Sequence, residues 1–580
     1  MEVPFNPLEA YRDGLGEAHK KNVAEAFGRL VEESGVDAKA NAATCRELAR
    51  LEKEVAAAEK SQERWGCLGA ALWTVFAVAV LAGIGGGVGL TQGGGDVAGA
   101  WLGGGLAGAV AMWSVWKWGV RGAIERAKAK VEELKGKRDA ARAEAEAQMA
   151  PLNALFDWDM AGKLCEKTLP LVKFDPYFSG GRLQDLRETF GWEGEGIGNG
   201  SVLWAQSGEI NGNPFVIGRV VEQRMGTATY RGEKTIHWTE SVRGSDGKMH
   251  LESRSQRLVA TVEKPAPEYP EKSFLLYANG AAERLRFTRE PSPMAGLEPG
   301  SRAAERAVKR CIKGLEKFAR NLDDQYGFTM SDPEFEAYFQ ATDRNDEVQF
   351  RVLYTVLAQR WTLELLKDRK VGFGDDFRLE KRGKINVTWP AHLRGEALDG
   401  DPARYRSHDL AKSREAFQRY NEAYFRHAYF ALAPLLAVPL YQQYRSHADI
   451  WGTAAGRASA APEHEALANY IGEARFKHPA SVTRNILKAT AGAGENGGRR
   501  VTVAAHGFRT ESRVDTVWVW GRDGRRHDVE VPWKEYFPVT ARREMRVVDA
   551  GDRPRAECLA DAAAGGDLAG LTYRRAVMGG

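Results

Sequence analysis

Four aspartates are the candidates for metal-dependent chemistry in this sequence. Two lie in the run Asp-Arg-Asn-Asp-Glu at 343–347, and two are adjacent in GFGDDF at 372–377. Carboxylates that converge in one cleft can bind a divalent cation, which then activates water for hydrolysis. The candidate metal ligands are Asp343, Asp346, Asp375 and Asp376, and no other catalytic residue is assigned.

Each pair of aspartates also has a structural interpretation. Asn345 suits the N-cap of a helix whose first turn holds Asp346 and Glu347, where the helix dipole favours negative charge. The second pair suits a turn, because the Glu-x-Lys spacing of metal-dependent nucleases would require lysine at Arg382. We expect the cap and the turn, and we keep the metal site as the alternative.

Other catalytic signatures do not occur in the sequence. It contains neither a GxxxxGK[ST] phosphate-binding loop nor a GxSxG nucleophile elbow. His464-Glu465 begins like a zinc-protease helix, but Ala468 stands where a second histidine is needed. No cofactor is therefore expected.

Positive charge is concentrated in the C-terminal part of the chain. Such a region could bind RNA, anionic lipid or an acidic partner, but we expect it to be a sheet edge whose charges prevent pairing with further strands. The net charge of the whole chain is only +4, so nucleic-acid binding is not indicated. The residues concerned are Arg499, Arg500, Arg509, Arg513, Arg522, Arg525, Arg526 and His527.

Two uncharged runs, 65–95 and 97–116, predict a membrane hairpin. About 20 helical residues suffice to cross the hydrocarbon layer of a bilayer. Tryptophans stand near both outer ends of these runs, as they do at membrane interfaces. Residues 117–138 hold eight lysines and arginines, whereas the loop between the runs has none. The positive-inside rule then predicts a two-span protein with both termini in the cytoplasm.

Glycines are frequent in both runs, in GIGGGVG and GAWLGGGLAGA. Small residues let two helices approach closely in lipid, so we expect the two spans to pack on each other. Oligomerisation through the remaining glycine faces is the alternative, and a conducting pore is a further one.

Amphipathic helices are expected on both sides of the hairpin, at 17–64 and 119–150. Apolar residues such as Leu51, Val55 and Leu134 recur there at spacings of three and four. Because a hairpin makes these helices emerge side by side, we predict an antiparallel coiled coil that stands off the membrane.

The rest of the chain is expected to be an α+β cytoplasmic region. Alternating runs between 195 and 292 predict antiparallel strands and a hairpin closed at Ser245–Gly247. The apolar stretch at 429–441 is too short for a span and contains prolines, which predicts a buried, kinked helix. The residues expected to face inward in the strand hairpin are Leu251, Leu258, Ala260 and Val262.

The fold class is therefore α+β: an N-terminal helical coiled-coil stalk with a two-helix transmembrane hairpin, then antiparallel β and helical cytoplasmic domains. The expected division is an N-terminal segment (1–16), a helix (17–64), the hairpin (65–118), a second helix (119–150), a mainly β domain (151–300), a mainly helical region (301–490), a β-rich region (491–555) and a disordered tail (556–580).

Three stretches carry a family resemblance: DPEFEAYFQATDRNDEVQFRVLYTVLAQ, GFGDDF and LAPLLAVPLYQQ. In these the chain resembles a group of uncharacterised bacterial membrane proteins with a two-span hairpin, two flanking helices and a large cytoplasmic α+β region. The resemblance covers most of residues 20–540. It implies this architecture and a location in the bacterial inner membrane, and it assigns no catalytic residues.

The leading functional hypothesis is a membrane-tethered scaffold, sensor or interaction module whose partners are membrane lipid and either a protein partner or further copies of itself. The second is a membrane-anchored enzyme that uses the four aspartates for metal-dependent hydrolysis. The third is a glycine-rich hairpin oligomer that alters membrane permeability.

Overall fold

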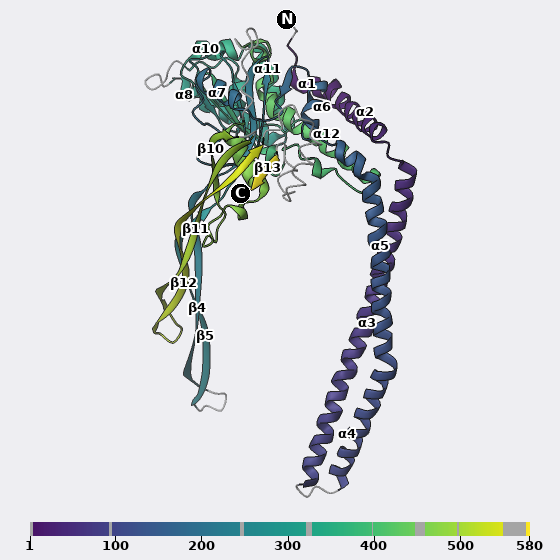
Figure 1. Ribbon diagram of the computed structural model, residues 1–580. Coiled ribbons are helices and arrows are strands. Elements are labelled where there is room, and N and C mark those ends of the chain that lie inside the picture. Colours follow the sequence, from purple (N-terminus) through teal and green to yellow (C-terminus); the bar gives the residue numbers. More distant parts are fainter. Residues whose placement is uncertain are drawn as a thin grey trace. The chain divides into compact units, whose positions relative to one another are not determined.

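The computed structural model describes residues 4–91, 96–243, 249–320, 328–396, 398–446, 459–495, 498–548 and 576–579. The chain divides into two compact units (Figure 1). The first comprises Met1–Val23, Trp158–Asp401 and Asn421–Gly580, and the second comprises Ala24–Asp157 and Pro402–Tyr420. Helices and antiparallel sheets are both present, as the α+β prediction requires.

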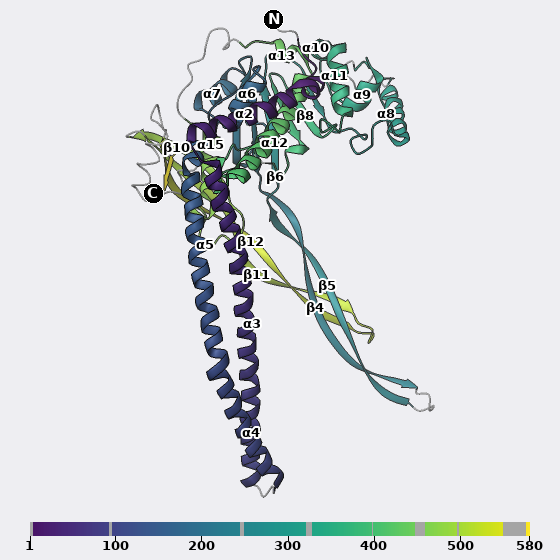
Figure 2. The ribbon, with the colours of Figure 1, turned by 90° about the vertical axis from the view of Figure 1, so that its right-hand side faces the viewer.

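A long helical hairpin forms most of the second unit (Figure 2). Its helices are α3 (Ala38–Thr91), α4 (Asp96–Val115) and α5 (Arg121–Leu155), with the π-helical turn η2 (Trp116–Val120) between the last two. Asn41 bonds to Gln148, and Glu59 lies 3.0 Å from Lys135. Contacts in this order along the two arms make the pairing antiparallel.

An apolar stripe is buried between α3 and α5, as the spacing of apolar residues predicted. It consists of Leu51, Val55, Ala58, Val131 and Leu134. At the base of the hairpin, Phe27, Phe156, Tyr405 and Phe417 form an aromatic cluster. The coiled-coil geometry itself stays a prediction.

The flanking helices differ from their predicted bounds. The helix expected over 17–64 is interrupted, because α2 (Gly16–Ser34) ends at Gly35, whose φ of +64° is the left-handed conformation of a helix C-terminus. The side chain of Asp37 then accepts hydrogen bonds from the amides of Lys39 and Ala40 and starts α3. The second helix, expected to end at 150, continues through Pro151 to Leu155.

A seven-stranded antiparallel sheet organises the first unit, in the order β1-β2-β3-β6-β9-β8-β7. The strands are β1 (Val172–Phe174), β2 (Ser201–Ile210), β3 (Asn213–Val221), β6 (Glu271–Ala278), β7 (Arg286–Arg289), β8 (Phe377–Arg382) and β9 (Ile385–Pro390). Asn211 and Gly212 both have positive φ and form the tight turn between β2 and β3.

Helices α8 to α11 stand between β7 and β8 in the chain. Strands β8 and β9 therefore lie within 301–490, the region expected to be mainly helical. Their bounds are α8 (Arg302–Arg320), α9 (Pro333–Phe339), α10 (Glu347–Leu353) and α11 (Val356–Lys367). The other short helices are α6 (Met160–Thr168), α7 (Gly180–Glu188), η4 (Ala391–Leu393), η5 (Pro402–Arg404) and η6 (Glu473–Arg475).

A second sheet contains β10 (Ile486–Glu495), β11 (Gly498–Trp520), β12 (Arg526–Val548) and β13 (Ala576–Gly579). Helix α15 (Ala461–Ile471) packs on both β2 and β10, and one hydrophobic core includes residues from both sheets. Strand β13 pairs with the end of β12, which corrects the expectation of a disordered tail at 556–580 for its last residues; 549–575 lie outside the described residues.

Two long β-ribbons stack on each other in the first unit (Figure 1). One is β4 (Arg224–Arg243) with β5 (Met249–Glu268), and the other is the outer part of β11–β12. Gly232 permits the close approach, because a Cβ atom there would collide with the carbonyl oxygen of Glu530. Leu258 and Ala260 are buried between the ribbons, as predicted, and Val262 packs against them.

Leu251 is 78 % exposed, which corrects its assignment as an inward residue. It lies beyond the end of the second ribbon, whose turn at Gly521 contacts Ile236. The predicted closing turn at Ser245–Gly247 lies outside the described residues.

Helix α12 (Leu410–Leu436) contains Pro434, and α13 (Pro439–Gln443) begins at the next proline. Their apolar stretch is buried, as predicted for 429–441, but where a kinked helix was expected the chain leaves the helical conformation between Leu436 and Pro439. The N-terminal helices α1 (Pro7–Ala10) and η1 (Tyr11–Leu15) pack against it, and Tyr11 contacts the rings of Phe425 and Phe430.

His19 holds the N-terminal segment to the first unit. Its Nδ1 lies 2.9 Å from the hydroxyl of Thr168, its Nε2 lies 3.1 Å from the carbonyl oxygen of Asn421, and its ring stacks on Phe425. Burial lowers the pKa of His19 to about 4 from 6.5. The neutral imidazole therefore belongs to the folded state.

We expect stability to fall below pH 6.5, where the unfolded chain takes up a proton at His19 and the folded chain does not. The loss grows until pH 4 and reaches about 2 to 3 kcal/mol at pH 4.5. Urea unfolding of the detergent-solubilised protein at pH 7.5 and 4.5 should show this loss in the wild type and not in His19→Asn. The exposed His237→Asn should behave as wild type, and an equal pH dependence in all three proteins would contradict the prediction.

Candidate functional site: an aromatic and basic belt on the helical hairpin

The most apolar stretch of α3 has little protein around it. Within the described residues, one helix region, Ala38–Leu81, is long and apolar enough to cross a membrane, and 6 % of its most apolar window is buried. Val78 and Leu81 are 66 % and 67 % exposed. A core helix of a soluble protein would instead be mostly buried.

An aromatic cluster lies toward the α5 side of this apolar stretch, eight residues inside the run that begins at Trp65. The rings of Trp73 and Trp116 meet edge to face with centroids 5.4 Å apart, and Phe76 lies 5.2 Å from Trp73. Together with Leu72, Met112 and Trp113 these rings line a shallow hollow between the two arms of the hairpin.

Two cations stand over the rings of this cluster. The Lys117 ammonium lies 4.5 Å from the centroid of Trp113, and the Arg121 guanidinium lies 5.9 Å from that of Trp116. Arg121 also pairs with Glu125 at 3.1 Å. Cations at such distances are attracted to the electron-rich faces of the rings. We call these rings and the two cations the belt.

The sequence-predicted metal candidates have separate structural roles. Asp375 is buried and pairs with the fully buried Arg289, and its second oxygen accepts a 2.8 Å hydrogen bond from the amide of Ser292. Burial lowers the pKa of Arg289, and the carboxylate opposes that effect. Asp375 therefore fastens β7 to the loop before β8.

The neighbouring Asp376 binds a different residue. Its carboxylate accepts hydrogen bonds from the backbone amide of His392 at 2.9 Å and lies 2.6 Å from Nδ1 of the same residue. The other ring nitrogen of His392 faces the carbonyl oxygen of His427 at 3.2 Å. With both ring nitrogens engaged, His392 orients the chain and offers no nitrogen to a ligand. The amide of Asp376 bonds to Gly374, so this stretch is the predicted turn.

Asp343 lies at the edge of the seven-stranded sheet, and Asp346 caps the N-terminus of a helix. Asp343 accepts from the amide of Thr288, and Asn345 bonds to the backbone of Arg286 beside it, so their side chains cover the outer edge of β7. The N-cap of α10 is Asp346, which accepts from Gln349, and this corrects the predicted cap at Asn345 by one residue.

No group of three or more His, Cys, Asp or Glu side chains in the described part of the chain could hold a metal ion. The four aspartates do not converge in one site. Each candidate ligand thus has a structural role, and no observation on the described residues favours metal chemistry.

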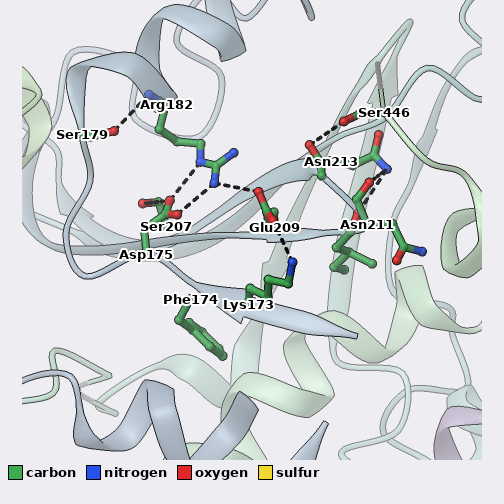
Figure 3. Close-up of polar contacts among 12 residues, drawn as sticks. Lys173, Phe174, Asp175, Ser179, Arg182, Ser207, Glu209, Asn211, Asn213 and Ser446 are labelled. Carbon is green, nitrogen blue, oxygen red and sulfur yellow. Dashed lines mark hydrogen bonds and ion pairs between the residues drawn. The ribbon is translucent and has the colours of Figure 1, made fainter. Parts of the chain in front are cut away.

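Another cluster of charges lies where α7 meets β1 and β2 (Figure 3). Arg182 makes two 2.9 Å hydrogen bonds to Asp175 and a third of 3.1 Å to Glu209. Ser207 donates to Asp175, and Lys173 lies 3.6 Å from Glu209. Burial would lower the pKa of Arg182, but the two carboxylates raise it. Two acids balance two bases, so this cluster fastens the sheet edge and carries no unpaired charge for a ligand.

Lys381 is a buried amine that the sequence analysis overlooked. It donates to the carbonyl oxygens of Gly383 at 2.7 Å and Ala281 at 3.2 Å, and burial lowers its pKa to about 7. The sequence held a signal for this burial, because Phe377, Leu379 and Lys381 occupy alternate positions of β8 and so lie on the same, buried face. Its two carbonyl acceptors give it a structural role.

His464 and Glu465 also lie in the core, at the start of α15. Glu465 accepts from the amide of Val202 at 3.1 Å and pairs with Lys488 at 3.3 Å, which links β2 to β10. In the basic C-terminal ribbon, Arg513 pairs with Glu535 at 2.8 Å. Such a cross-strand pair stabilises the ribbon, and the charge-protected sheet edge stays a prediction.

The sequence matches no family model, and comparisons with curated proteins and with solved structures found no match.

We expect Asp375→Asn to lower the free energy of unfolding by about 3 to 5 kcal/mol, because it leaves Arg289 as an uncompensated buried charge. Denaturant unfolding would measure this loss. Asp343→Asn, which keeps an acceptor for the amide of Thr288 at the exposed edge, should lose less than about 1 kcal/mol. Equal effects of the two substitutions would contradict the structural roles assigned here.

Proposed function

We propose that this chain is an integral protein of the bacterial inner membrane that anchors an interaction module, scaffold or sensor. In this proposal α3 and α4 cross the membrane as two spans, both termini lie in the cytoplasm, and the first unit is the part that meets partners. The single observation that carries the proposal is the apolar surface of α3, which is long enough to span and is left uncovered by the rest of the chain.

The helical hairpin supports a second span. Helix α4 carries no charged residue between Val97 and Val115, and it returns along α3 with Gly108 against Ala79. Lipid can cover apolar residues on the outside of such a pair, while small residues between the helices allow them to pack. An antiparallel coiled coil of α3 with α5 belongs to the same proposal.

The alternative functions have less support. An enzyme that uses Asp343, Asp346, Asp375 and Asp376 needs these carboxylates together, and each of them is engaged elsewhere. A permeability function needs a polar path, and the uncharged runs offer no ionisable residue for one.

Two cysteine substitutions test the topology in a chain whose native cysteines are replaced by serine. Thr91→Cys, at the turn end of α3, should react with a membrane-impermeant maleimide added to spheroplasts. Lys130→Cys, on α5 beyond the belt, should react only after permeabilisation. Protection of both positions, or reaction of both, would contradict two spans with cytoplasmic termini.

The outer half of the β4–β5 ribbon is the element that we propose to meet a protein partner. Beyond Ile236, the last residue of β4 buried against the second ribbon, the residues 239–241 and 251–255 are exposed on both faces. Among the described strands β4 pairs only with β5, so along 239–241 and 251–255 the outer edge of each strand has no strand partner. Two-stranded ribbons are marginally stable in isolation, and free edges are templates for pairing.

A photo-reactive residue placed at Leu251 should therefore form a discrete adduct with another protein in intact cells. The matched control is the same probe at Gln184, which is exposed on α7. Adducts that are absent at Leu251, or equal at both positions, would contradict the assignment of this ribbon.

A further inference from the structure

We propose that the belt binds the phosphate of an anionic phospholipid in the cytoplasmic leaflet. Lys117 and Arg121 would contact the phosphate, and the hollow lined by Trp73, Trp113 and Trp116 would take the start of an acyl chain. The inference rests on the proposed function, because it requires the hairpin to lie in a membrane.

The position of the belt along the hairpin matches the depth of a headgroup. Trp73 stands 18 residues before Thr91, and Trp113 stands 17 residues after Asp96. At about 1.5 Å per residue each distance is about 26 Å, close to the thickness of the hydrocarbon layer. If the turn lies at the outer surface, the rings fall at the inner interface, where tryptophan is favoured.

The belt has an apolar floor and a positive rim. Six residues line the hollow, all of them apolar or aromatic: Leu72, Trp73, Phe76, Met112, Trp113 and Trp116. Lys117 and Arg121 are four residues apart in sequence, so they lie one turn apart on one face of the helix. This combination complements an amphipathic anion, whereas free phosphate would gain nothing from the floor.

Among the described residues, no acidic side chain pairs with Lys117. Its ammonium lies over the ring of Trp113 instead. Arg121 keeps Glu125 as a partner at 3.1 Å but directs its guanidinium over Trp116 as well. A phosphate between the two cations would receive charge-assisted hydrogen bonds from both.

General electrostatic attraction is the competing explanation. Eight basic residues lie between 117 and 138, and each basic residue near an anionic surface attracts it whether or not a site exists. A bound site and diffuse attraction differ in one respect: a site depends on which lysines and arginines are present, whereas diffuse attraction depends on how many.

The experiment uses the full chain reconstituted in phosphatidylcholine vesicles that contain a minor fraction of lipid with brominated acyl chains, which quench tryptophan on contact. The brominated lipid is either phosphatidylglycerol or phosphatidylcholine, at equal fractions. We expect stronger quenching by the anionic lipid. Lys117→Gln/Arg121→Gln should lower this preference at least about fivefold, because the bound phosphate would lose the charge-assisted hydrogen bonds of both side chains.

Two further variants separate a site from its competitors. Lys128→Gln/Lys130→Gln removes the same charge about three turns further along the helix and should keep the preference. Lys117→Arg/Arg121→Lys keeps both charges and should keep it too. Both variants leave the tryptophans of the belt in place.

Three results would overturn the proposal. Equal loss in the two charge-removing variants would mean diffuse attraction, and equal quenching of the wild type by both lipids would mean no preference. Either result leaves the membrane anchor intact. Absence of quenching by both brominated lipids would overturn the anchor together with the site.

Discussion

The uncovered apolar surface of α3 is the constraint on which the rest of the hairpin depends. Val78 and Leu81, 66 % and 67 % exposed, belong to a row of such side chains. Apolar surface left in water costs about 25 cal/mol per square ångström, so a surface of this kind must be covered. Part of it is covered by α4, where glycine and alanine let the helices approach. We propose that lipid covers the rest.

The same constraint explains where charge returns to the hairpin. No charged residue interrupts the first run after Arg64, and the second run ends at Lys117. There the cations lie over tryptophan rings, so an amphipathic ring meets an apolar neighbour on one side and a charge on the other. The belt thus follows from one boundary between apolar and polar surroundings, and the proposed phospholipid site uses that boundary.

Buried charge organises the first unit. The pairs Arg289–Asp375 and Arg344–Glu336 are almost wholly withdrawn from solvent, and Arg344 lies between the rings of Phe328 and Phe350. Loss of one partner from such a pair is costly, because the other is left charged and without solvent. Arg289–Asp375 joins β7 to the loop before β8, and Arg344–Glu336 joins α9 to the segment before α10. An aspartate that the sequence offered as a metal ligand is therefore engaged in holding the fold.

Local patterns in the sequence were enough to determine the long apolar helix, the antiparallel strands, the turn at Gly374 and the buried helix with Pro434, because hydrophobic spacing and chain geometry act within a few residues. Only the tertiary structure decided which residues meet across long separations. Strands β8 and β9 join a sheet begun more than a hundred residues earlier, and Asp375 finds Arg289. Alternation assigned Leu251 to the inward face of a strand, and the same pattern places the overlooked Lys381 on the buried face of β8. What covers each of these faces depends on where a second ribbon ends or a sheet packs. The sequence carries no local signal for what covers a strand face, because this is set by contacts between distant segments.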